Sequence, residues 1–557
     1  MNTPTRSFHP LFYLLWLLVA LIQAGNTELL DDEAYYWVFS QHLDWGYFDH
    51  PPMTALLIRA GYWIFPNELG VRFICVLLST GTIYLLEKMT LQNQPRLFYS
   101  IALSMIALQI GGFLAVPDIP LLFFTALFFY RYDRFLKNEN WTTALWLGIS
   151  AAMLLYSKYH GVLILFFTLL SNLKLFRSGF VYAAGMLAFL LFTPHLWWQY
   201  QHDWVSFRYH LQESNVNPYK TSYTIEYLVG QIFLPGPLIG FLLLPAALLY
   251  RTQNAFERAL RFTAIGIYLF FFLSSFRGRV EGNWTAPALI PLTILAHGYI
   301  AGRIKWEKLI YRLLIPGLML ILVLRIGLMI DFLPGKAIAS RVHSWKNWPD
   351  SIKKKTGGLP VVWLNSYQRA SKYAFYTNQS THSLNFYRER RNNYNFWPIE
   401  DSLQGKKVVV MDIYDMHRYT DSIQTPIGWV GYRIDSSFSG TSKYWFDPFK
   451  HELTVRSGDA VRISGTFRTP LFTQSTSSAV NKEQIESIRI GVFQKGSWIK
   501  DWMLDPNILS RSSDGIYFDA TITDRLPAGE FVLVFALNAP GLPPTHNSRK
   551  IRLTITQ

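Results

Sequence analysis

Long apolar runs separated by short polar loops fill the chain from its N-terminus to about residue 333. A transmembrane helix prefers about 20 predominantly apolar residues, and several of these runs are somewhat shorter. The pattern predicts a polytopic helical membrane domain over residues 1–333, with about eleven spans. The predicted spans lie near residues 10–25, 69–87, 97–115, 119–132, 142–156, 160–173, 180–196, 228–250, 261–276, 284–302 and 311–333.

Beyond residue 333 the hydrophobic pattern becomes that of an ordinary soluble protein. Residues 361–364 and 407–411 form short continuous apolar runs, which are typical of buried strands, and helix-compatible sequence lies between them. This arrangement predicts a small α/β domain over residues 334–424.

From residue 425 the apolar residues alternate with polar ones, as in 460–465, 487–492 and 531–536. Turn residues separate these segments, a pattern that favours a β-sandwich-like domain over residues 425–557. The predicted fold class is therefore a polytopic α-helical membrane protein with a C-terminal soluble α/β plus β-sandwich-like region.

The basic residues of the membrane domain fall in alternate loops, which the positive-inside rule places in the cytoplasm. An odd number of spans then puts the N-terminus in the cytoplasm and the soluble region on the outer side of the membrane. Acids and aromatics follow the first apolar run instead of a small-residue cleavage site, so we expect a retained span and not a signal peptide.

The net charge of +15 is thus explained by membrane topology, and nucleic acid is not an expected partner. Cys75 is the single cysteine, so an intrachain disulfide is impossible. The soluble region must therefore be held together by its hydrophobic core.

Three carboxylates, Asp31, Asp32 and Glu33, follow the first span directly. Burying them in lipid would be costly, so the span delivers them to the water interface. There they can deprotonate a bound hydroxyl. The alternative is an acidic helix N-terminus, where Asp is favoured and the helix dipole stabilises negative charge.

Aromatic residues follow these acids at once, with Tyr35, Tyr36 and Trp37 in one run. Aromatic rings can stack on the apolar faces of sugars, and they also form belts at membrane interfaces. The mixture of acids and aromatics favours the binding of a polyhydroxylated molecule at the membrane surface.

The sequence Asp49-His50-Pro51-Pro52 lies further along the same loop. Its two prolines fix the backbone, so Asp49 and His50 are presented on a stiff turn. This turn either belongs to a site, where Asp49 is predicted to contact the sugar or the acceptor, or caps the apolar segment 53–65. That segment is too short for a span and is expected to be an interfacial helix.

Two shorter outer loops add further polar groups. Asp118 lies between two prolines, and Lys158 and His160 interrupt two apolar runs. The two basic side chains can bind an anionic headgroup. A helix N-cap is the alternative role for Asp118, and snorkelling is the alternative for Lys158.

Residues 194–210 are rich in histidine and tryptophan, including His195, Trp198 and His202. The histidine spacing superficially suggests a metal site, but no tight pair such as His-Glu-x-x-His is present and acidic partners are few. These side chains are therefore predicted to contact a sugar or acceptor, and no metal site is predicted.

Arg277 and Arg279 occupy an outer loop, against the positive-inside trend. Arginine forks bind phosphate well, and the neighbouring glycines allow close approach. Pairing with the first-loop acids is the structural alternative. Glu281 and Asn283 in the same loop are predicted to contact the sugar or the acceptor.

All these groups converge on one face of the membrane domain. The Asp-Glu after the first span, the Asp-His-Pro-Pro downstream and the Pro-Asp-Ile-Pro after the third span resemble the GT-C glycosyltransferases over roughly residues 1–330. The similarity is to bacterial relatives of the dolichyl-phosphate-mannose protein mannosyltransferases. That group includes lipid A aminoarabinose transferase and the rhizobial core galacturonosyltransferases.

The resemblance implies a polyprenyl-phosphate-linked sugar as donor, with transfer on the outer leaflet and inversion at the anomeric carbon. An envelope glycan, a glycolipid or a protein would be the acceptor. Unlike the related oligosaccharyltransferases, which use a divalent metal, this subgroup is not expected to require a metal or other cofactor.

Site roles also follow from the motif positions. The resemblance implies that Asp32 is the catalytic base, that Glu33 beside it is also a catalytic residue, and that Asp118 is a second catalytic acid. His50 stands where aminoarabinose transferase has a lysine that contacts donor phosphate. Arg277 or Arg279 could supply the charge that this replacement removes, beside Lys158 and His160.

Two other functions stay open. A transporter or flippase for a lipid-linked glycan should carry ionisable groups in mid-span and often shows inverted repeats. Here the polar groups lie at helix ends on one face, which favours the enzyme. A glycan-binding or assembly role for the β-rich tail would leave the acidic first loop unexplained.

Overall fold

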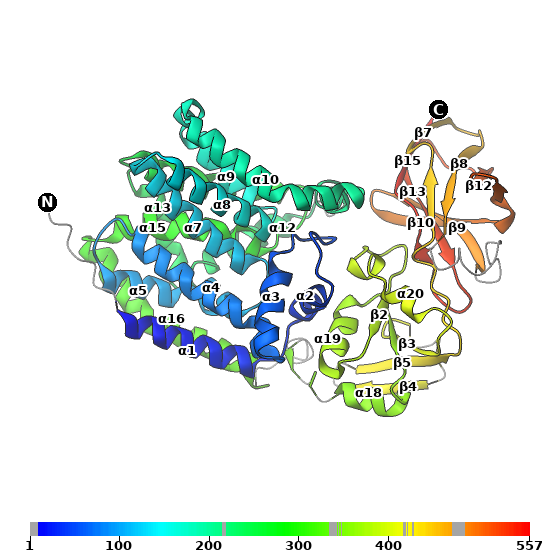
Figure 1. Ribbon diagram of the computed structural model, residues 1–557, viewed down its shortest axis with the longest axis horizontal. Coiled ribbons are helices and arrows are strands. Elements are labelled where there is room, and N and C mark those ends of the chain that lie inside the picture. The colour runs from blue at the N-terminus through cyan, green and yellow to red at the C-terminus, as the bar shows by residue number, and fades with distance from the viewer. Residues whose placement is uncertain are drawn as a thin grey trace. The chain divides into compact units, whose positions relative to one another are not determined.

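The structure is a computed structural model that describes residues 9–213, 219–332, 342–343, 345–346, 348–415, 419, 421–425, 428–469 and 485–557. The chain divides into two compact units, Met1–His343 and Ser344–Gln557. The first unit is helical, and the second combines sheets with short helices (Figure 1). The predicted change from a helical to a sheet-rich region is therefore confirmed.

Helices account for nearly all regular structure in the first unit. They are α1 (Pro10–Asn26), α2 (Asp31–Gln41), α3 (Met53–Ile64), α4 (Glu68–Met89), α5 (Pro95–Ser104), α6 (Ile106–Gln109), α7 (Asp118–Lys137), α8 (Trp141–Ser157), α9 (Gly161–Ser171), α10 (Gly179–Gln201), α11 (Val205–Arg208), α12 (Thr221–Phe233), α13 (Gly240–Leu249), α14 (Ala255–Ser274), α15 (Leu289–Ile300) and α16 (Ile304–Met329). Single turns connect some of them: η1 (Gly111–Phe113), η2 (Leu173–Arg177), η3 (Tyr209–Glu213) and η4 (Gly282–Ala288).

Every predicted span overlaps at least one of these helices. Among the described residues, α4, α10 and α16 are long and apolar enough to cross a membrane alone. Two bent pairs bring the number to at most 5, namely α1 with α2 at 88° and α5 with the segment 106–113 at 71°. The count of about eleven spans stays a prediction.

Two predicted spans, 97–115 and 228–250, are each broken into separate helices. The first bends at Met105, where α5 ends. The second stops at the sequence Pro235-Gly236-Pro237, because proline lacks the amide donor and its ring clashes with the preceding helical turn. Gly236 has φ +153°, and a Cβ there would lie 2.6 Å from the carbonyl oxygen of Ser104.

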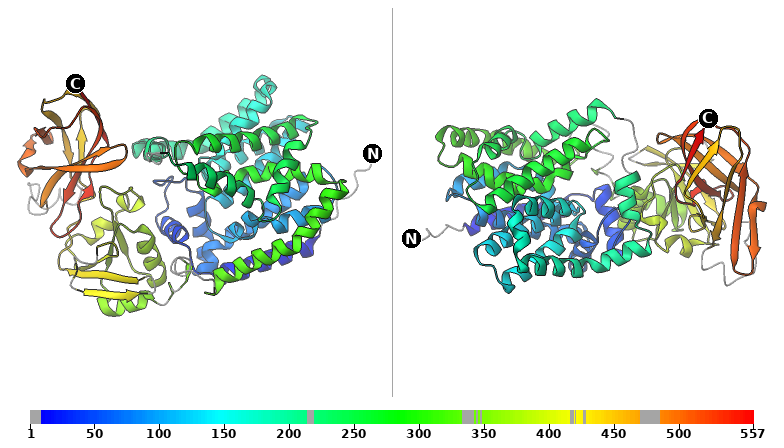
Figure 2. Two further views of the ribbon diagram at one scale, coloured as in Figure 1. Left: turned by 180° about the vertical axis from the view of Figure 1, so that it is seen from behind. Right: turned by 90° about the horizontal axis from the view of Figure 1, so that it is seen from above.

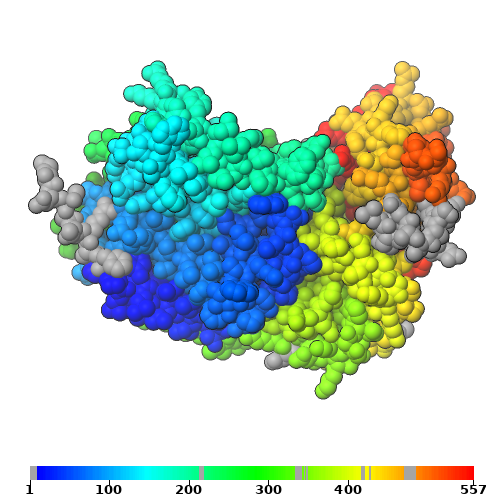
Figure 3. Space-filling view, in the orientation of Figure 1, coloured from blue at the N-terminus to red at the C-terminus, as the bar shows by residue number. Residues whose placement is uncertain are grey.

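The first and last long helices of this unit, α1 and α16, lie side by side (Figures 1 and 2). Arg325 of α16 joins them, because its guanidinium donates to Gln23 of α1 at 3.2 Å and to Gln109 of α6 at 2.7 Å. In the space-filling view, α1 in dark blue and the turquoise surface of α10 lie at opposite edges of this unit (Figure 3).

The second unit begins with a five-stranded mixed sheet in the order β2-β1-β3-β5-β4. Strand β1 pairs in parallel with β2 and β3, whereas β5 is antiparallel to β3 and β4. The strands are β1 (Val361–Leu364), β2 (Thr381–Leu384), β3 (Val408–Asp412), β4 (Asp421–Thr425) and β5 (Gly428–Asp435), and the helices are α18 (Trp348–Thr356), α19 (Tyr367–Thr377) and α20 (Ile399–Leu403). The predicted boundary at residue 424 falls inside β4, so this sheet continues to Asp435.

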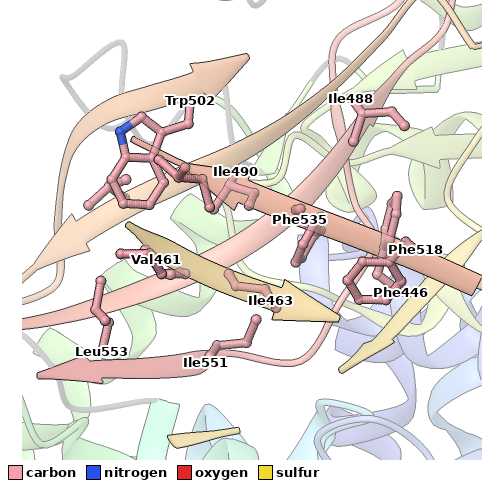
Figure 4. Close-up of a cluster of buried hydrophobic side chains, with 14 of the residues drawn as sticks. Phe446, Val461, Ile463, Ile488, Ile490, Trp502, Phe518, Phe535, Ile551 and Leu553 are labelled. Atoms are coloured by element: carbon pink, nitrogen blue, oxygen red, sulfur yellow. The ribbon is translucent and has the colours of Figure 1, made fainter. Parts of the chain in front are cut away.

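The remaining strands form two facing sheets. One has the order β10-β9-β13-β15-β7, with β14 paired to β13, and the other has the order β11-β12-β8-β6. Their side chains meet in one core that includes Phe446, Ile463, Ile490 and Phe535 (Figure 4). The strands are β6 (Trp445–Pro448), β7 (Glu452–Arg456), β8 (Val461–Arg468), β9 (Ser487–Gln494), β10 (Ser497–Leu504), β11 (Leu509–Ser512), β12 (Gly515–Ile522), β13 (Gly529–Asn538), β14 (Thr545–His546) and β15 (Ile551–Thr556). Buried and exposed residues alternate along β8 and β15, as a sandwich requires.

Candidate active site

The acidic triplet forms the first turn of α2, directly after the bend that follows α1. Asp31 is half-buried, Asp32 is exposed and Glu33 is fully buried. A helix N-terminus stabilises negative charge, which explains why three carboxylates are tolerated in one turn. Within the triplet, the Glu33 side chain is therefore placed to make contacts inside the protein, whereas the Asp32 side chain is exposed to solvent.

Glu33 is held by four donors. Its Oε1 lies 2.7 Å from Nε of Arg72, and its Oε2 lies 2.5 Å from the terminal nitrogen of the same guanidinium. It also accepts from the amides of Leu30 at 3.0 Å and Ala115 at 2.9 Å. The Ala115 contact ties the first turn of α2 to the loop that leads into Asp118, so the two acidic outer loops are physically joined.

Arg72 is the partner that organises this turn. Besides Glu33, its guanidinium donates to the backbone carbonyls of Ala24 at 2.9 Å, Thr27 at 2.5 Å and Glu28 at 2.9 Å. These carbonyls lie where α1 ends, and such orphan groups need a donor when buried. Arg72 therefore fixes the bend that presents Asp31 and Asp32.

A second ion pair joins two further outer loops. Lys158, at the end of α8, donates to Oδ1 of Asp118 at the start of α7 over 2.7 Å. Asn283 donates to Oδ2 of the same carboxylate at 2.7 Å. Asp118 and Lys158 are both 6% exposed, so this pair is largely desolvated and its partners are tightly coupled.

His50 and His160 belong to the same cluster. The Nδ1 atom of each ring is buried and has no hydrogen-bond partner within the described residues. The ring of His50 contacts Tyr36 edge-on at 5.5 Å, and that of His160 packs against Trp284 at 5.7 Å. Burial lowers the pKa of His50 to about 4, and the positive charge of Lys158 acts in the same direction.

The first-loop aromatics pack inside the protein. Tyr35 is 1% exposed, and Tyr36 and Trp37 are also buried. Tyr35 contacts Phe39 edge-on at 4.6 Å, while the Trp37 ring contacts Tyr62 at 5.7 Å. Their rings contact other protein rings, and the predicted sugar stacking stays a prediction.

The histidine- and tryptophan-rich segment holds the first loop in place. His195 of α10 is fully buried, with Nδ1 2.7 Å from the carbonyl of Trp45 and Nε2 3.2 Å from the hydroxyl of Tyr159. Trp198 donates to Asp44 at 2.8 Å, and its ring stacks on His202 at 4.0 Å. These contacts make the predicted sugar-binding residues His195, Trp198 and His202 supports of the loop that carries Asp49 and His50.

The same anchor contains residues that the sequence did not single out. Gln199 donates to the Tyr159 hydroxyl at 2.9 Å and to Ser206 at 2.6 Å, and Ser206 donates to the carbonyl of Tyr47 at 2.8 Å. On the other side of the turn, His210 lies 2.9 Å from the carbonyl of Asp49. Asp49 itself is 6% exposed.

The arginine loop lies at the surface. Arg279 pairs with Glu226 at 3.4 Å and with Glu281 at 3.6 Å, all largely exposed. Arg277 is exposed and makes no ion pair within the described part of the chain. Within the described residues neither arginine forms the alternative ion pair with the first-loop acids, and Asn283 is the residue through which this loop reaches the cluster.

No group of three or more His, Cys, Asp or Glu side chains in the described ranges is arranged to hold a metal ion. The expectation that the reaction requires no metal stays a prediction.

Several known proteins are similar to this chain in sequence or in fold. A family model described as dolichyl-phosphate-mannose-protein mannosyltransferase matches residues 49–198, which include His50, Asp118, Lys158 and His160. The chain is 27% identical over 319 residues to lipid A galacturonosyltransferase RgtD of Rhizobium johnstonii. That match covers 53% of this chain and 65% of the relative, so the chain spans less than two thirds of the relative's length.

The fold is also found in solved structures. ArnT from Cupriavidus metallidurans in the apo state matches with a TM-score of 0.58 and 13% identity, over 76% of this chain and 97% of ArnT. The same protein bound to undecaprenyl phosphate matches with a TM-score of 0.55 and 14% identity, over the same shares of the two chains. The predicted resemblance to the GT-C glycosyltransferases is therefore confirmed, and the chain has the ArnT-like GT-C fold.

Proposed function

We propose that this chain is an inverting glycosyltransferase that moves a sugar from a polyprenyl-phosphate donor to an acceptor at the outer face of a bacterial inner membrane. The acceptor is an envelope glycan, a glycolipid or a protein. The observation that carries the proposal is the junction of four outer loops, in which Glu33 accepts a hydrogen bond from the loop before Asp118, and Asp118 accepts hydrogen bonds from Lys158 and Asn283. The lipid A acceptor in the name of RgtD and the undecaprenyl phosphate bound to ArnT support the same assignment.

Asp32 is proposed as the catalytic base. It is exposed on the first turn of α2, where an acceptor hydroxyl can approach it. The carboxylate takes the hydroxyl proton as the acceptor oxygen bonds to the anomeric carbon, because a neutral hydroxyl is a poor nucleophile. The bond from the anomeric carbon to the phosphate oxygen breaks in the same step, and that oxygen keeps the electron pair. A single displacement of this kind inverts the anomeric configuration.

Glu33 is proposed to act through its neighbours. Four donors already occupy its carboxylate, which leaves it poorly suited to accept a proton from a substrate. The sequence predicted a catalytic role for Glu33, and we propose instead that it is a positioning residue, which holds the turn that presents Asp32.

The leaving polyprenyl phosphate gains negative charge, and preorganised cations stabilise such charge. Lys158, His50 and His160 form the buried group proposed to hold it. The exposed Arg277 and Arg279 are proposed to contact the phosphate from the solvent side. A transporter is less well supported, because Asp118 and Lys158 lie at helix ends and not in mid-span.

Mass spectrometry of envelope glycolipids and glycans from a deletion strain tests this function. Loss of one sugar mass, restored by the wild-type gene, would support the transferase and name its sugar and acceptor. Accumulation of a complete lipid-linked glycan in the deletion strain would instead support the transporter.

A further inference from the structure

The buried cation of the cluster is already neutralised. Lys158 donates to Asp118 at 2.7 Å, and the second oxygen of that carboxylate is occupied by Asn283. Asp49 is buried close by and adds a further acidic group. The preformed centre therefore offers no net positive charge to a phosphate, although a buried anion needs compensating charge.

Histidines are the groups in this centre that can supply charge. His50 faces Tyr36 of α2, Asp118 of α7, Lys158 at the end of α8 and His210 of η3, besides its neighbour Asp49. His160 follows Lys158 and faces the same lysine and both other histidines. The Nδ1 atoms of His50 and His160 are buried without a hydrogen-bond partner in the described structure, so each ring has a free position for a new contact.

The protein groups around His50 favour its neutral form. Burial lowers its pKa to about 4, and Lys158 and His210 lower it too, which outweighs the opposing effect of Asp49 and Asp118. A phosphate anion would act like an additional carboxylate and favour the imidazolium form. The coupling is reciprocal. Protonation of His50 must therefore raise the affinity for phosphate by the same factor by which bound phosphate raises the affinity of His50 for the proton.

We infer that the phosphate of the lipid-linked donor enters this centre together with a proton from solvent, which His50 takes up. This inference rests on the proposed function and adds proton coupling to it. No covalent bond changes in the step: neutral imidazole, proton and phosphate anion become an imidazolium–phosphate pair. When the phosphate binds, His50 thus supplies the positive charge that Lys158 does not offer, because Asp118 already neutralises the Lys158 ammonium.

The inference fixes the sign of a pH effect. From about pH 4 upward, the free protein carries a neutral His50 and the complex carries a charged one. Affinity for the phosphate should therefore fall as the pH rises, by up to about tenfold per pH unit while one proton is taken up. The decline should end where the pH passes the pKa of His50 in the complex.

Calorimetry of the full-length protein in detergent, titrated with undecaprenyl phosphate at pH 6 in buffers of different ionisation enthalpy, measures the protons taken up. His50→Lys installs a permanent cation and should bind with about one proton fewer than the wild type. Ionisation of the lipid itself is common to both proteins and cancels. His42→Gln alters another histidine of the same loop and should leave the proton count unchanged.

Further variants separate the possible failures. His160→Gln should retain the wild-type count, and loss of the proton there but not in His50→Lys would overturn the assignment to His50. If His50→Lys does not fold, His50→Gln should bind at least tenfold more weakly than wild type at pH 5.5 and approach it at pH 8.5. Equal proton uptake by wild type and His50→Lys would refute this inference alone, whereas no binding by the wild type would refute the proposed donor class.

Discussion

Glu33 and Arg72 form a two-pronged ion pair, with 2.7 Å between Oε1 and Nε and 2.5 Å between Oε2 and the terminal nitrogen, and both side chains are fully buried. The same guanidinium binds the carbonyls of Ala24 and Thr27, where α1 ends. One residue of α4 therefore sets the bend between α1 and α2. Because Arg72 holds the neighbouring Glu33 in the interior of this unit, the position of the exposed Asp32 on the same turn is fixed as well.

Replacing Arg72 with methionine should destabilise the protein by about 3–5 kcal/mol, because Glu33 would be left as an unpaired buried charge. The measurement is thermal unfolding in detergent. The control is Lys137→Met, which removes the exposed partner of Asp133 in a helical pair and should change stability by less than about 1 kcal/mol. Equal effects of the two variants would contradict the role given to Arg72.

Removing the Lys158 ammonium should lower kcat/KM and should also destabilise the protein, because Asp118 would be left as an unpaired buried charge. Lys158→Met deletes the cation proposed to stabilise the leaving phosphate, and loss of one such interaction costs about 10²–10³ in rate. Asn283→Ala removes one hydrogen bond to Asp118 and should cost about ten- to a hundredfold. Transfer assays on membranes from each variant, normalised to folded protein, measure both. Wild-type turnover by Lys158→Met would remove it from the mechanism.

The loop that carries His50 should be sensitive to one added methyl group at Gly46. A Cβ there would lie 2.5 Å from the Trp198 ring and 3.0 Å from Nδ1 of His195. Gly46→Ala should therefore destabilise the protein by about 1–3 kcal/mol and reduce transfer. Gly185→Ala is the matched control, since a Cβ at that position of α10 meets no atom within 4 Å. The thermal unfolding midpoints of both variants test whether Trp198 and His195 pack tightly against Gly46.

Acid should destabilise the soluble unit through His546. Burial lowers the pKa of this histidine to about 3, and the charges of Arg391 and Lys550 lower it further. Between that value and about 6.5 the unfolded chain binds the proton that the folded unit excludes, so stability falls as pH falls. From pH 7 to pH 5 the wild type should lose about 2 kcal/mol more than His546→Gln. Urea unfolding followed by tryptophan fluorescence tests the difference, and identical pH dependence in the two proteins would contradict it.

Hydrophobic periodicity predicted the main architecture correctly. Each predicted apolar span overlaps at least one helix of the first unit, and the strands expected at 361–364 and 487–492 are β1 and β9. Two of the predicted spans are interrupted in the structure. The sequence Pro235-Gly236-Pro237 within the run 228–250 is typical of a helix end and could have been recognised as one. The break at Met105 has no proline or left-handed glycine at that position, so the sequence did not indicate it.

The site was less accessible to sequence reasoning. Arg72 could have been found, because a charged residue inside an apolar run normally has a buried partner. Tyr159, Gln199 and Ser206 carried no comparable signal, since their hydrogen bonds arise only when the loops after α8 and α10 meet. The roles of Asp32, Asp118 and the other site residues stay predictions.

The most direct test of the central claim is complementation of a deletion strain with Asp32→Asn and, separately, with Asp31→Asn, followed by mass spectrometry of the envelope glycolipids and glycans. The two acids are neighbours on one helical turn, so the pair controls for charge and for folding. The account predicts that Asp31→Asn restores the missing sugar and that Asp32→Asn inserts normally but restores none of it. Full restoration by Asp32→Asn would show that the base lies elsewhere and would contradict the proposed mechanism.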